Sequence, residues 1–302
     1  MDKPASAVAR ELAIDEVIGS PLDDRRFVPL RRLGQSPTAL AGATIIGAVV
    51  VIALAAPVLS PDHPFAQIAR PLLRASPRYL LGTDDLGRDE LSRVIWGARV
   101  SLYVGILSVS IAIALGATSG LLAAFYGRWV DALLMRIMDV LFSLPAIVLA
   151  IAITSILGPS LTNAMIAIGI VYAPTFARIA RGPALAVMNL PYIDAARTLG
   201  APDWRIMSRH VLPNVSAPLL VQTTVSLSTA ILTEAALSFL GLGTQPPTPS
   251  WGLMLSDARQ YMLLDPWIAI FPGAAIAITV LGFNLLGDGL RDILDPRIQT
   301  LI

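Results

Sequence analysis

The sequence contains no cysteine, a single lysine and only two histidines among its 302 residues. Without cysteine the chain forms neither disulfides nor thiolate metal sites, and it has no cysteine nucleophile. Two histidines, His63 and His210, are too few for a multi-histidine metal site. We therefore expect neither a bound metal nor a cofactor.

Charge is also scarce. Asp, Glu, Lys and Arg make up 14% of the chain, whereas 55% is hydrophobic. Ordinary soluble domains carry roughly 25% charged residues, which cover their surface. The deficit indicates a protein surrounded by lipid. The net charge of +1 gives no reason to expect nucleic acid as a partner.

Several apolar stretches are long enough to cross a bilayer, which takes about 20 residues. They lie at residues 39–59, 101–125, 134–157, 161–180, 212–240 and 266–287. Backbone groups in lipid must be paired, and continuous runs of this length favour helices over barrel strands. The predicted fold is an all-α membrane protein with about six transmembrane helices.

The arginines predict the orientation, because basic residues gather in cytoplasmic loops. Arg25, Arg26, Arg31 and Arg32 lie shortly before the first span, so we expect the N-terminus and, after six crossings, the C-terminus in the cytoplasm. The first exterior loop, 60–99, disagrees because it carries six arginines of its own.

This topology predicts four segments. They are a cytoplasmic tail 1–36, a first helix and external loop 37–100, a five-helix core 101–290 and a cytoplasmic tail 291–302. Residues 88–99 could form an amphipathic helix lying on the outer membrane surface.

The interior loop 191–214 has helical content that a simple connection does not need. Tyr192 to Leu199 reads as a short helix that Gly200 ends, and a second helix runs from Pro202 to Val211. From physics alone, such a knob could dock into a partner's groove or merely connect two spans.

The same loop resembles the EAA loop of ABC importer permeases. That motif reads EAA, three residues, Gly, nine residues and I-x-L-P. Here Asp194-Ala195-Ala196 precedes Gly200 by three residues, and His210-Val211-Leu212-Pro213 follows. Asp replaces Glu at 194 and His replaces Ile at 210.

Stretches 81–102, 234–255 and 283–297 also resemble the oligopeptide and dipeptide branch of these permeases. The likeness covers about residues 36–300 and is greatest to the second permease of the pair in dipeptide, oligopeptide, glutathione and nickel importers. It implies type I ABC importer architecture, with a multi-pass location in the bacterial inner membrane.

The resemblance implies partners as well. A homologous second permease would complete the pathway, two cytosolic ATPases would dock on the EAA-like loops, and an external binding protein would deliver peptides. The implied ATPase-coupling residues are Tyr192, Asp194, Ala195, Ala196, Leu199, Gly200, Asp203 and Arg205. The permease is not expected to be an enzyme, because it has no phosphate-binding G-x-x-x-x-G-K-[ST] loop.

Polar residues near the span ends are interpreted as structural. Glu234 is expected to pair with Arg93 or Arg99 near the outer surface. Arg136 with Asp139, and Asp288 with Arg291, have the i, i+3 spacing of helical ion pairs.

An alternative function is a secondary transporter driven by an ion gradient. It would need ionisable groups near mid-membrane, whereas Glu234 and Asp139 lie near span ends. A membrane-embedded enzyme would need clustered acids, histidines or serines at one depth, and we see none.

Overall fold

The computed structural model describes residues 36–294, so most of the two predicted tails lies outside the described residues. Within that range the chain is helical, with α3 (Pro37–Leu54), α4 (Ala56–Leu59), α5 (Glu90–Tyr126), α6 (Arg128–Phe142), α7 (Ala146–Leu157), α8 (Leu161–Met188), α9 (Pro191–Thr198), α10 (Asp203–Ile206), the π-helical η1 (Met207–Val211), α11 (Leu212–Phe239), α12 (Trp251–Ala258) and α13 (Trp267–Leu294). This confirms the predicted fold class.

Five helical stretches are long and apolar enough to cross a membrane. A sixth crossing is present if α6 and α7, which meet at 92°, count as one broken span. The expected continuous span 134–157 is therefore wrong in its middle. Pro145 lacks an N–H and disfavours helical geometry at Leu144, and this interrupts the helix between Phe142 and Ala146.

The expected surface helix 88–99 is not a separate element. Asp89 caps α5 by accepting a hydrogen bond from the Ser92 N–H, and the helix then runs unbroken to Tyr126. Its 37 residues span about 56 Å, well beyond the bilayer's apolar core. The first turns of α5 therefore extend past the apolar core.

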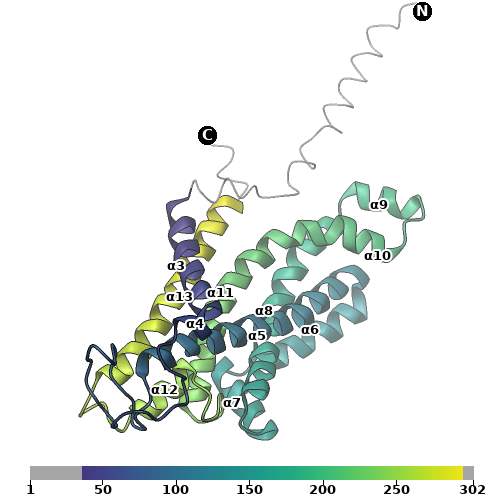
Figure 1. Cartoon of the computed structure of the whole chain (residues 1–302). Coiled ribbons are helices and arrows are strands. Elements are labelled where there is room, and N and C mark those ends of the chain that lie inside the picture. Colours follow the sequence, from purple (N-terminus) through teal and green to yellow (C-terminus); the bar gives the residue numbers. More distant parts are fainter. Residues whose placement is uncertain (1–35, 295–302) are drawn as a thin grey trace, which may run out of the picture.

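Close helix contacts hold the bundle together. Helix α3 lies along α13, and α5 lies along α8 (Figure 1). A Cβ at Gly42 would overlap the Leu286 backbone nitrogen, and one at Gly120 would overlap the Ala177 carbonyl oxygen. Small residues let these backbones approach, as is usual in membranes.

The two ends of the bundle carry different structures. Helices α9 and α10 protrude at the end where α3 begins and α13 finishes, whereas α12 and the 60–89 loop lie at the opposite end (Figure 1). By the predicted orientation, the first end is cytoplasmic and the second is external.

Candidate functional site

The cytoplasmic knob, residues 191–211, is built by local rules. Gly200 follows α9 with φ +77°, a conformation that suits glycine. Its N–H donates to the Arg197 carbonyl, and the Ala201 N–H donates to the Ala196 carbonyl. These two bonds form a Schellman motif, as the sequence predicted for this helix end.

Apolar anchors fix the knob to the bundle. Ile193 and Ile206 are fully buried, and Val211 is nearly so. The Tyr192 and His210 rings lie 5.8 Å apart, and the Arg197 guanidinium lies over the Phe125 ring at the end of α5. The knob is therefore a packed part of the molecule.

Its outer surface is apolar at two positions. Leu199 is 87% exposed and Trp204 is 65% exposed, on either side of Gly200. The predicted coupling residues Asp194, Ala195, Leu199, Gly200, Asp203 and Arg205 are all exposed, while Tyr192 and Ala196 are half-buried. Sequence reasoning missed Trp204, although a tryptophan between two charged residues in a loop was a usable signal.

The second knob helix continues into the membrane. Residues 203–239 form one continuous helical stretch, with the π-helical turn just before Pro213. Pro213 has no N–H to donate to the Arg209 carbonyl, and a wide turn there avoids the clash of its ring with the preceding backbone. Trp204 is thus connected to the bundle core by one continuous helical stretch.

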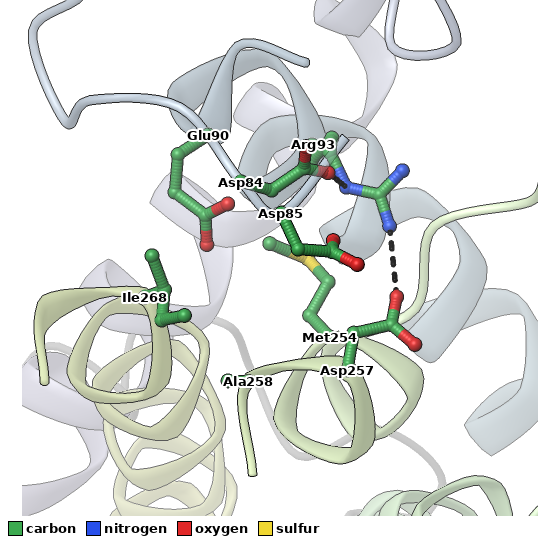
Figure 2. Close-up of a pocket in the computed structure, with 8 residues that line it drawn as sticks. All are labelled: Asp84, Asp85, Glu90, Arg93, Met254, Asp257, Ala258 and Ile268. Carbon is green, nitrogen blue, oxygen red and sulfur yellow. Dashed lines mark ion pairs between the residues drawn. The ribbon is translucent and has the colours of Figure 1, made fainter. Parts of the chain in front are cut away.

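A buried ion-pair cluster lies at the external end. Arg93, 1% exposed, places its Nε 3.2 Å from Asp84 Oδ2 and its Nη2 3.6 Å from Asp257 Oδ2 (Figure 2). Arg88 also pairs with Asp84, and its Nη2 lies 3.6 Å from Asp85. The cluster joins the 60–89 loop, α5 and α12.

This cluster accounts for part of the orientation conflict in loop 60–99. Two of its six arginines, Arg88 and Arg93, are buried among carboxylates and are not free basic charges. Burial raises the pKa of Asp257, and burial together with neighbouring Asp84 raises the pKa of Asp85.

Glu234 is fully buried, but its predicted arginine partner is wrong. Its Oε1 accepts hydrogen bonds from Ser238 Oγ at 2.6 Å and from Thr244 Oγ1 at 3.2 Å. Arg93 instead forms ion pairs with Asp84 and Asp257. The carboxylate thus ties the end of α11 to the loop that follows it.

The other two predicted ion pairs are also wrong. Asp139 binds Arg178 at 2.8 Å instead of Arg136, and Asp131 receives two 2.6 Å hydrogen bonds from Arg181. These bonds hold α6 against α8. Within residues 36–294, no ion pair joins Asp288 to Arg291.

Known proteins share this sequence and fold. Residues 112–300 match the binding-protein-dependent transport system inner membrane component, and residues 29–77 match the N-terminal TM domain of oligopeptide transport permease C. The chain is 46% identical to the dipeptide transport system permease protein DppC of Alkalihalophilus pseudofirmus, over 89% of each chain.

Other relatives carry related names. The chain is 47% identical to the di/tripeptide transport system permease protein DppC of Pseudomonas aeruginosa, over 90% of this chain and 93% of that one. The glutathione transport system permease protein GsiD of Pectobacterium atrosepticum is 49% identical over 74% of this chain and 75% of its own.

A solved structure shares the fold. The inward-facing MetNI methionine ABC transporter aligns with a TM-score of 0.54 and 20% identity, covering 67% of this chain and 97% of that one. With the helical bundle and the family match together, the chain belongs to the binding-protein-dependent transport system inner membrane components and is a multi-pass permease subunit of an ABC importer.

Proposed function

We propose that this permease forms half of a pathway for di- or oligopeptides and couples it to ATP hydrolysis through the cytoplasmic knob. A homologous permease supplies the other half. Two cytosolic ATPases dock on the knobs, and an external binding protein delivers the peptide. The names of the relatives support the peptide substrate.

The observation that carries the coupling role is the exposed apolar pair on the knob. Leu199 and Trp204 are large exposed side chains, while Ile193 and Ile206 of the same knob are fully buried. Exposed aromatic and aliphatic anchors on a rigid support are typical of protein-binding surfaces. The charges at Asp194, Asp203 and Arg205 would form a polar rim around these anchors.

The continuous helix 203–239 supports transmission. A movement of the docked ATPases would act on Trp204 and pass along α11 toward the external end, where Glu234 joins the helix to the next loop. An ion-gradient transporter would have no use for this knob.

The test compares two proline substitutions that disturb equivalent turns. Gly200→Pro replaces a residue with φ +77° by one fixed near −65°, and removes the N–H that binds Arg197. Gly158→Pro disturbs a glycine with φ +91° between α7 and α8, at the other end of the bundle. Both glycines have open space around their Cβ positions.

In liposomes containing the complete importer, Gly200→Pro should abolish ATP-driven peptide uptake and stimulation of the ATPase by the loaded binding protein. Gly158→Pro should retain both to a substantial degree. Assembly of each complex is checked by size-exclusion chromatography. Wild-type coupling in an assembled Gly200→Pro complex would refute the coupling role of the knob.

A further inference from the structure

A cavity of about 340 Å³ lies at the elbow between α6 and α7. Its walls come from the break itself and from one face of α8. The lining residues are Leu141 to Ala146, Val171, Tyr172 and Thr175. The volume falls within the range of small-ligand pockets, roughly 300–1,000 Å³.

The elbow lies midway along the broken span. Helix α6 begins one residue after α5 ends, beside the knob, and its 15 residues rise about 22 Å. Helix α7 adds 12 residues, about 18 Å, before the turn into α8 at the other end. Because the two helices meet at 92°, their lengths do not add along the membrane normal, but the non-helical backbone at residues 143–145 lies between the two ends of the bundle, within the apolar stretch.

Lipid cannot satisfy the polar groups of such a break. Irregular backbone at this depth occurs where protein covers it or where it lines an aqueous cavity. Within the described residues, no side chain caps the start of α7, and Ser143, Leu144 and Pro145 are exposed. A partner's transmembrane helix would satisfy these groups poorly, because its own backbone groups are already paired.

The walls suit the neutral amide groups of a ligand. Hydroxyls are present on Ser143, Tyr172 and Thr175, and apolar surface comes from Phe142 and Leu144. No charged side chain lines the cavity. Such walls can hydrogen-bond a peptide main chain and accept varied neutral side chains without selecting a charged one.

One wall is connected to the coupling helix. The Tyr172 hydroxyl and the Thr233 hydroxyl are 2.8 Å apart, which links α8 to α11. Helix α11 is continuous with the knob, so a movement at Trp204 would also displace Tyr172 in the cavity wall.

From these observations we infer that the elbow cavity binds the main chain of the transported peptide during its passage. This inference rests on the proposed function, because it assigns a place in the pathway to the same substrate. The occupant is the peptide itself, and lipid and the partner permease are the competing occupants.

A photo-crosslinking experiment on the complete reconstituted importer distinguishes the occupants. Benzoylphenylalanine replaces Leu144 in the cavity wall. In the control it replaces Ile156 near the external end of α7, where the side chain is exposed but outside the cavity. The binding protein is loaded with short tritiated peptides, and the sample is irradiated during ATP turnover.

The expected result is several-fold more tritium on the permease carrying the label at Leu144 than at Ile156. The inference would be overturned if the label at Leu144 formed adducts only with the partner permease or with lipid. Equal tritium at the two positions would also overturn it. Uptake by the wild-type importer is measured in parallel. Normal wild-type uptake without tritium at Leu144 would refute peptide binding in the cavity and leave the proposed function intact. Absent wild-type uptake would refute the proposed function itself.

Filling the cavity gives a second measurement. Thr175→Trp should lower peptide uptake several-fold while the binding protein still stimulates ATP hydrolysis, because the knob is untouched. Thr118→Trp, at an exposed position on α5 outside the cavity, should leave uptake near wild type. Unchanged uptake in Thr175→Trp would contradict peptide binding at the elbow.

Discussion

At the scale of single residues, the external cluster shows how buried charges are held in this protein. Arg93 is almost inaccessible to water and lies among the carboxylates of Asp84 and Asp257. Removing one partner of such a pair leaves a buried charge uncompensated, which costs more than the intact pair contributes. The cluster therefore fixes the position of α12 against α5.

Asp85 should make the stability of this end depend on pH. Its pKa is raised by burial and by Asp84, so the folded protein binds this proton more tightly than the unfolded chain. The stabilisation from this group is fully present below its ordinary pKa of 3.8 and is lost as pH rises through the folded pKa. Arg88 and Arg93, which face it, oppose the shift.

We expect Asp85→Asn to remove this dependence. On acidification from pH 7 toward pH 4, about the unfolded pKa of the carboxyl, the wild-type melting temperature in detergent should rise relative to that of the variant. Asp62→Asn, which removes the partner of exposed Arg78 outside the cluster, serves as control. A constant difference between wild type and Asp85→Asn across this range would contradict the burial of Asp85.

At the scale of helices, α3 depends on close contact with α13. Few of its side chains are buried, and Gly42 lies against the backbone of Leu286 and Gly282. Van der Waals packing of small residues is a main source of helix association in lipid. The contact is therefore sensitive to any added side chain at Gly42.

We expect Gly42→Leu to push α3 away from α13 and to destabilise the bundle by about 1–3 kcal/mol, the usual cost of overpacking. Gly47→Leu adds the same side chain on the same helix where nothing lies within 4 Å, so it should have little effect. Thermal unfolding followed by tryptophan fluorescence compares the two. Equal melting temperatures would mean that the α3–α13 contact is looser than described.

At the scale of the whole molecule, the two ends face different compartments. The cytoplasmic knob and the α12 region lie at opposite ends of the bundle (Figure 1). Leu199 on the knob and Leu263 in the loop before α13 are both highly exposed. Because the chain has no cysteine, single cysteines can report each end separately.

In intact cells that make the permeases without the ATPases, a membrane-impermeant maleimide should label Leu263→Cys and should reach Leu199→Cys only after the inner membrane is opened. The outer membrane, where one is present, is first made permeable in both samples. The basis is the excess of arginine at the knob end. The reverse labelling pattern would show that the orientation is inverted.

The fold class, the positions of most apolar spans and the turn at Gly200 could be predicted from the sequence. Each of these depends on neighbours in the chain or on the lipid solvent. Apolar length sets a span, and a positive φ favours glycine wherever the surroundings leave space. The four sequence stretches also identified the family, because their motifs can be recognised without knowing what they contact.

The partners of the charged groups and the shape of the elbow could not be predicted from the sequence, because they depend on tertiary packing. Arg93 forms an ion pair with Asp257, which lies far away in the sequence. Asp139 pairs with Arg178 although Arg136 is nearer to it in the sequence. Many pairings satisfy the same helical spacing, and packing selects among them. The 92° bend likewise follows from how α6 and α7 pack against α8, since a proline permits a break without setting its angle.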